Sequence, residues 1–204
     1  MPLSDPAPRE PIHTRTIACR GYRRADGLWD IEGHLVDTKT YAFENSHRGT
    51  VEPGTPVHEM WLRLTIDEEM RVHGVEAVFD YAPFRPCPEI APGFKVLEGL
   101  RIGPGWRGRV NRLLGGVKGC THLVELLGPL GTVAFQSLVG RRRKTTEMSG
   151  KKPFVIDSCH ALASDGEVVA AEWPEFHTDP PELQTNPNDG SEPDRRARCR
   201  AGKE

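Results

Sequence analysis

Polar and hydrophobic residues alternate along the first half of the chain, which predicts β-strands. The clearest run is residues 28–36, LWDIEGHLV, in which Trp29, Ile31, Gly33 and Leu35 share one face and the polar residues Asp30, Glu32 and His34 share the other. Similar runs predict strands over 14–22, 60–66 and 72–79. Asp26-Gly27 lies between the first two strands and is a strong hairpin signal.

The hydrophobic period changes in the second half of the chain. Residues 86–97 are compatible with a short helix, 107–114 predict a second one, and a leucine-rich helix is expected to begin near Cys120. Residues 154–173 read as a final hairpin with Asp165-Gly166 as its turn. Strands followed by helices predict an α+β fold, with a mostly antiparallel sheet backed by two or three helices in a single domain.

Eight apolar residues on the inward faces of these elements are expected in the core: Trp29, Ile31, Leu35, Leu62, Leu64, Ile66, Leu123 and Leu127. We expect residues 1–11 to be a flexible arm and 12–176 to be the domain. Residues 177–204 are rich in proline and charge and hold few apolar residues, so we expect a disordered tail.

Composition favours a cytoplasmic protein without a membrane anchor. The 204 residues carry 27 Lys+Arg and 29 Asp+Glu, a formal net charge of −2. We expect no apolar run of the roughly 18 residues that a spanning helix requires. The N-terminus has no basic segment followed by an apolar one, and the five cysteines are an odd number, so neither export nor a disulfide framework is expected.

Charge is unevenly distributed along the chain. Residues 101–152 hold eleven Lys/Arg and two Glu, whereas the rest of the chain is acidic. This basic excess could bind an anionic ligand or dock a partner. Aromatic residues do not interleave with the 141–144 run, RRRK, which makes nucleic acid an unlikely ligand and a solvated loop the simpler interpretation.

The strongest chemical signal is Cys120-Thr-His122 at the expected start of a helix. The positive end of a helix dipole favours a thiolate, which is both a nucleophile and a soft-metal ligand. Taken alone, a buried structural cysteine beside a surface histidine is the more common explanation of such a pair.

Other cysteines and histidines lie at the boundaries of the expected elements. Cys87 lies in the rigid turn FRPCPE, and His58 opens the third strand. Zinc takes four ligands of this type, and iron–sulfur clusters take thiolates. A site of His58, Cys87, Cys120 and His122 would therefore require distant residues to converge, because no C-x2-C pair exists. On a strand, adjacent Cys159 and His160 would point to opposite faces, so at most one would join such a site.

Several familiar motifs are absent from the sequence. There is no phosphate-binding G-x4-GK[ST] loop, no dinucleotide fingerprint after a strand and no G-x-S-x-G elbow, so no nucleotide cofactor is expected. Asp30, Glu32 and His34 could supply acid–base groups, but the solvated face of an antiparallel sheet is the better interpretation.

Four segments resemble the bacterial family of domain of unknown function 2889. They are RGYRRADGLWDIEGHLVDTKTY, PVHEMWLRLTID, GCTHLVELL and DSCHALASDGEVV, and the resemblance extends over residues 15–176. It implies no established activity.

A remoter resemblance is to the NifU/IscU-like iron–sulfur scaffold family, through TPVHE followed by WLRLTID, Cys87, and Cys120-Thr-His-Leu. It implies a NifU/SufE-like core with an added N-terminal hairpin, and it implies that His58, Cys87 and Cys120 occupy ligand positions, with His122 or Glu59 nearby. The sequence departs from that family where His58 replaces the first cysteine. A histidine there suits zinc better than a transferred cluster.

Three functional hypotheses follow. The first is a metal-binding accessory protein that holds zinc or an iron–sulfur cluster through His58, Cys87, Cys120 and His122. The second is a cysteine-dependent enzyme acting on an acyl or thioester substrate, with Cys120 as nucleophile and His122 as base. The third is a module that binds a small anionic ligand or a protein partner through the basic excess at 101–152.

Overall fold

The computed structural model describes residues 3–179, apart from the side chains of 141–149. The chain divides into two compact units, Met1–Thr145 and Thr146–Glu204. The predicted arm and tail stay predictions, and most of the tail lies outside the described residues.

A four-stranded antiparallel sheet forms the first unit, in the order β1 (His13–Arg23), β2 (Trp29–Lys39), β5 (Pro56–Ile66) and β6 (Val72–Tyr81). All four strands were predicted, and each is longer than its pattern, with β5 beginning four residues earlier than expected. A two-stranded hairpin, β3 (Phe43–Asn45) and β4 (Gly49–Val51), lies in the connection between β2 and β5. Its strands are too short for alternation to reveal.

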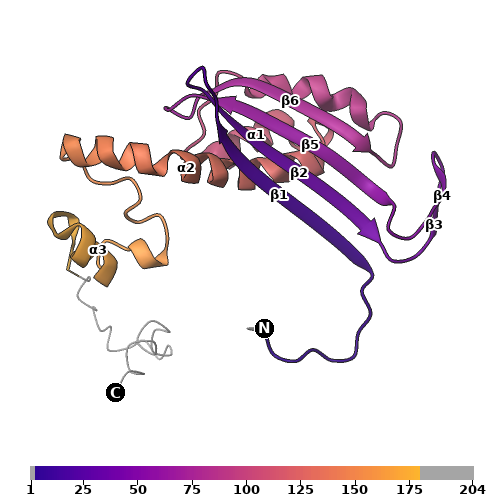
Figure 1. Ribbon diagram of the computed structural model, residues 1–204, viewed down its shortest axis with the longest axis horizontal. Coiled ribbons are helices and arrows are strands. Elements are labelled where there is room, and N and C mark those ends of the chain that lie inside the picture. Colours follow the sequence, from indigo (N-terminus) through magenta and orange to yellow (C-terminus); the bar gives the residue numbers. More distant parts are fainter. Residues whose placement is uncertain (1–2, 180–204) are drawn as a thin grey trace, which may run out of the picture. The chain divides into compact units, whose positions relative to one another are not determined.

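Helices η1 (Cys87–Leu97), α1 (Trp106–Leu114), η2 (Gly116–Lys118) and α2 (Thr121–Ser149) follow the sheet along the chain. Figure 1 shows α1 and α2 on one side of the sheet. The α+β class with an antiparallel sheet is confirmed. All eight predicted core residues are buried, none more than 9% exposed.

Gly33 lets α2 approach β2 closely. A Cβ atom at Gly33 would lie 3.2 Å from Cδ2 of Leu130. The leucines of α2 that face the sheet are fully or almost fully buried: Leu123, Leu126, Leu127, Leu130 and Leu138. This packing holds the first turn of α2, and with it His122, against the sheet.

Helix α2 is long and apolar enough over Thr121–Gly140 to cross a membrane by length and composition, with a mean hydropathy of 1.4. The expectation that no segment reaches this threshold is therefore wrong. The buried leucines nevertheless contact the sheet, while exposed positions recur every three or four residues and hold small or polar side chains: Thr121, Glu125, Pro129, Thr132, Gln136 and Gly140. That pattern is typical of a core helix with one face to solvent. A cytoplasmic location stays a prediction.

The second unit contains η3 (His160–Leu162), α3 (Glu167–Glu172) and η4 (Pro174–Phe176). The predicted hairpin over 154–173 is wrong. Gly166 closes a turn, in which its N–H donates to the Ala163 carbonyl at 2.8 Å, but the chain then enters a helix instead of a second strand. Gly166 is the N-cap of α3, and its carbonyl accepts a hydrogen bond from Ala170 N–H at 3.0 Å. The run Val-Val-Ala-Ala is continuous and apolar, a pattern that does not distinguish a short strand from a buried helical turn.

Candidate metal site

Asp37 is a buried carboxylate near the end of β2, on the face that packs against the helices. Its side chain is only 3% exposed. The other buried positions on this face of β2 hold apolar residues or glycine. A buried ionised carboxylate is unfavourable unless charged or hydrogen-bonding groups surround it. The residues around Asp37 therefore define the site.

Strand register brings two of these residues directly beside Asp37. Arg15 pairs with Asp37 across β1 and β2, and His58 pairs with it across β2 and β5. Arg15 donates through Nε to Oδ1 and through Nη2 to Oδ2, both at 2.8 Å. His58 Nδ1 lies 3.0 Å from Oδ2. An antiparallel sheet alone thus assembles a cation, a carboxylate and an imidazole.

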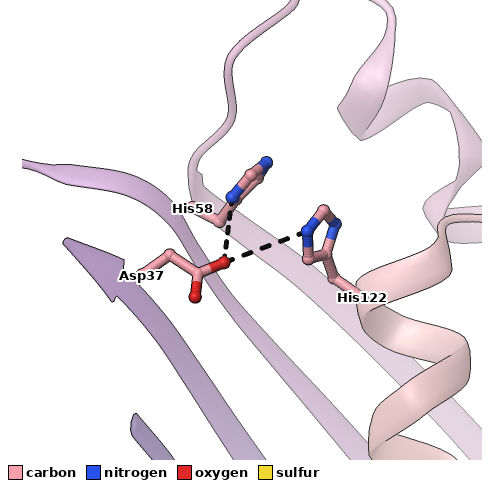
Figure 2. A group of neighbouring side chains, drawn as sticks. All are labelled: Asp37, His58 and His122. Atoms are coloured by element: carbon pink, nitrogen blue, oxygen red, sulfur yellow. Dashed lines mark hydrogen bonds and ion pairs between the residues drawn. The ribbon is translucent and has the colours of Figure 1, made fainter. Parts of the chain in front are cut away.

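Two further histidines complete the surroundings of Asp37. His13, on β1, places Nε2 3.2 Å from Oδ1. His122, in the first turn of α2, places Nε2 3.9 Å from Oδ2. The His58 and His122 rings lie side by side, with centroids 3.9 Å apart and planes tilted by 33°. Figure 2 shows both imidazoles converging on the same carboxylate oxygen.

Electrostatics favour an ionised Asp37 between neutral histidines. Burial alone would raise the pKa of Asp37, but hydrogen bonds and charge from Arg15 outweigh it, and the net pKa is lowered. Burial lowers the pKa of both His58 and His122, and in His58 the adjacent His122 adds to the effect. An ionised carboxylate and neutral imidazoles are the forms that bind metal ions.

These shifts predict how stability depends on pH without metal. A histidine whose pKa is lowered by folding takes up its proton more readily in the unfolded chain. Its contribution to the free energy of unfolding is therefore complete above its ordinary pKa of 6.5 and is lost as pH falls below that value. Asp37 contributes above its ordinary value of 3.8, and that contribution is lost as pH falls toward its lowered native pKa. Urea unfolding in chelator should give a lower free energy at pH 5.5 than at pH 7.5. The His58→Gln variant should reduce this difference, and an unchanged difference would contradict the assignment.

Among the described residues, Asp37, His58 and His122 form a group that could hold a metal ion. Each offers one ligand atom, and these atoms lie within 4.8 Å of one another. Two histidines and one carboxylate suit a divalent transition metal and leave coordination positions open.

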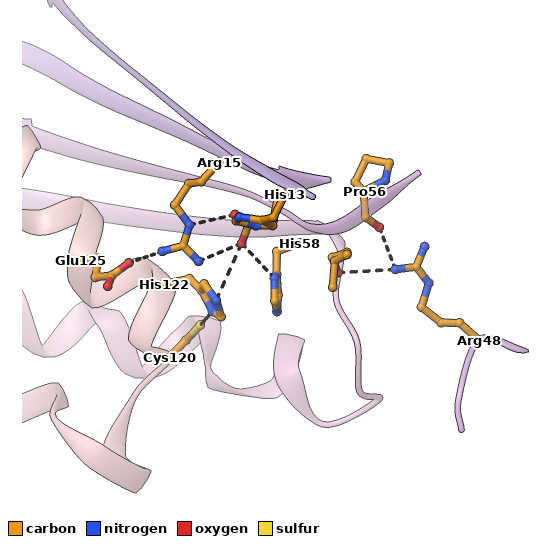
Figure 3. Close-up of polar contacts among 10 residues, drawn as sticks. His13, Arg15, Arg48, Pro56, His58, Cys120, His122 and Glu125 are labelled. Atoms are coloured by element: carbon orange, nitrogen blue, oxygen red, sulfur yellow. Dashed lines mark hydrogen bonds and ion pairs between the residues drawn. The ribbon is translucent and has the colours of Figure 1, made fainter. Parts of the chain in front are cut away.

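The structure brings together two of the four predicted metal ligands, His58 and His122. Cys120 lies just before α2 with its Sγ 3.8 Å from His122 Nδ1, outside the metal-binding group (Figure 3). Cys87, at the start of η1, is also outside that group. Glu59 instead contacts His34, with 3.0 Å between Oε1 and Nε2.

Cys159 and His160 lie in the second unit. Cys159 is exposed and His160 opens η3. Neither lies on a strand, so the argument from opposite strand faces does not apply to them.

Sequence reasoning missed Asp37, although a signal was present. The alternation that puts Ile31 and Leu35 inward also puts Asp37 inward, because it is two residues further along the strand. A carboxylate that falls on the apolar face of a strand is buried, and it therefore requires charged or hydrogen-bonding groups around it.

One family model matches the chain. The family is described as "Protein of unknown function (DUF2889)", and the match covers residues 13–136, which is more than half of the chain. No curated protein and no solved structure matches significantly. The resemblance to NifU/IscU-like scaffolds is therefore not supported.

Proposed function

Since this chain belongs to the DUF2889 family, whose function is unknown, we propose its role from the site alone: it binds a divalent metal ion through Asp37, His58 and His122. The observation that carries this proposal is the convergence of three ligand atoms of suitable type from β2, β5 and α2. The buried position of Asp37 on an otherwise apolar face adds support.

The donor set favours zinc over an iron–sulfur cluster. Clusters are held by thiolates, and this group offers two imidazoles and a carboxylate. Zinc accepts exactly such nitrogen and oxygen ligands, with a water in the open position. Ferrous iron uses the same donor types, so metal analysis decides between the two.

Arg15 and His13 would act as outer partners of the metal ligand Asp37. A carboxylate has about four lone-pair positions, so it can accept hydrogen bonds from Arg15 and His13 and still bind a cation. Such outer partners orient metal ligands in many proteins. Arg15 also keeps Asp37 ionised, as the lowered pKa of Asp37 indicates.

A specific contact favours a second candidate, the cysteine-dependent enzyme. Cys120 Sγ, His122 Nδ1, His122 Nε2 and Asp37 Oδ2 follow one another at separations of 3.8 Å and 3.9 Å on the two sides of the imidazole. A nucleophile, a base and an orienting carboxylate take this order in covalent catalysis. Both contacts are longer than ordinary hydrogen bonds. Cys120 and His122 are also only two residues apart, so their proximity is weaker evidence for a site than the convergence of distant residues. We therefore place this candidate second.

Metal titration of the untagged protein tests the first candidate. We expect one zinc ion per chain at pH 7.5, and one Co²⁺ ion that gives visible absorption bands. Equilibrium dialysis followed by elemental analysis measures the stoichiometry. A protein that retains neither metal after dialysis against metal-free buffer would refute the proposal and leave the thiol chemistry of Cys120 as the function to examine.

A further inference from the structure

The guanidinium group of Arg15 contacts two carboxylates that are held very differently. On one side, Nε and Nη2 donate to Asp37, whose side chain is 3% exposed. On the other side, Nη1 donates to Glu125, whose side chain is 58% exposed. Arg15 is therefore fixed by a buried carboxylate and presents a further N–H group to a carboxylate that reaches it from the solvent side.

The contact with Glu125 is the replaceable one. Exposed ion pairs contribute little to stability, because water solvates both charges and the side chains lose freedom when they pair. A dissolved carboxylate of the same chemistry can therefore compete with Glu125 for Arg15. It would not compete in the same way with Asp37, which is buried and makes two hydrogen bonds to the guanidinium group.

This replaceable position adjoins the metal-binding group. Glu125 is three residues after His122 on α2, so the two side chains emerge on one face of the helix. Figure 3 shows the guanidinium group of Arg15 between Glu125 and His58, with His122 close by. A ligand bound to Arg15 in place of Glu125 would therefore lie at the helix face that carries His122.

We propose that the Glu125 carboxylate occupies the place of a ligand carboxylate, and that this site takes a small carboxylate anion bound jointly by Arg15 and the metal ion. The inference deepens the metal-binding function proposed above and rests on it. A divalent ion and Arg15 together carry three positive charges against one on Asp37. The excess favours an anionic ligand over a neutral one.

The test uses the Co²⁺-loaded full chain, titrated with acetate and, separately, with neutral acetamide at constant ionic strength. Acetate should change the visible absorption of the bound Co²⁺ in a saturable way, and acetamide should not. Inorganic phosphate is titrated as a second anion. If acetamide matches acetate, or if phosphate alone binds, recognition of a carboxylate is overturned.

Three variants locate the recognition. Glu125→Gln removes the internal competitor and should tighten acetate binding by about 2- to 5-fold, the range expected for an exposed ion pair. Arg15→Gln should weaken it by about tenfold or more, since it removes a charged donor. The matched control Glu69→Gln, in the turn between β5 and β6, should leave acetate affinity unchanged.

The Co²⁺ stoichiometry, measured on each sample before titration, distinguishes a failure of metal binding from a failure of carboxylate binding. If the native chain binds no Co²⁺, the proposed function fails and this inference fails with it. If Co²⁺ is bound but acetate leaves its spectrum unchanged, only the carboxylate inference fails. Glu125→Gln is the deciding variant, because Glu125 is exposed and its loss does not threaten the fold, and unchanged acetate affinity in it would overturn the proposal.

Discussion

Replacement of His122 or His58 by alanine is expected to lower zinc affinity by more than about 100-fold. Loss of an outer partner of a metal ligand typically costs about 10- to 100-fold, and loss of one of three direct ligands should cost more. The same result is expected for Asp37→Asn, which keeps the shape of the side chain but removes its charge. Competition with a chromogenic chelator measures these affinities.

Two controls show whether the loss is specific. His73→Ala removes an imidazole that pairs with Asp67, 2.7 Å away and outside the metal-binding group, and should leave zinc affinity unchanged. Cys120→Ser should also retain the metal, because Cys120 lies outside that group. If Cys120→Ser loses zinc while His58→Ala keeps it, a thiolate is the ligand and the site assigned here is wrong.

Replacement of Leu126 by alanine is expected to lower the free energy of unfolding by about 2–5 kcal/mol. Leu126 is fully buried in the core between α2 and the sheet, so its truncation removes apolar contacts and leaves a cavity. Urea denaturation followed by circular dichroism, without detergent, measures the change.

Gln136→Ala on the same helix is the matched control for Leu126→Ala. Gln136 is exposed, so the free energy of unfolding should change by less than about 0.5 kcal/mol. An unchanged stability in Leu126→Ala would contradict the packing of α2 as a core helix. Such a result would instead favour a helix that inserts into a membrane, which the length and apolar composition of α2 also allow.

The faces of the strands and helices were predictable because periodicity is a local property. Successive side chains of a strand point to opposite faces, so the alternation around Ile31 and Leu35 predicts both the strand and its buried face. The leucines of α2 predict its inward side in the same way. The second unit was not predictable by this means, because the apolar run around Val169 has no period.

The candidate site depends on distances that the local pattern does not contain. The spacing of apolar residues indicated that His58 and His122 lie at element ends, and it offered Cys87 and Cys120 equally well as companions. Only the register of β1, β2 and β5 puts Arg15 and His58 on either side of Asp37.

By itself, the sequence determined the fold class, the four main strands and the core, because each depends on neighbours a few residues away. Tertiary structure decided the ligand set. His122 reaches Asp37 because Gly33 admits α2 close to β2, and its partners lie 64 and 85 positions earlier in the chain. A contact across such a separation depends on packing and register, which hydrophobic periodicity does not encode.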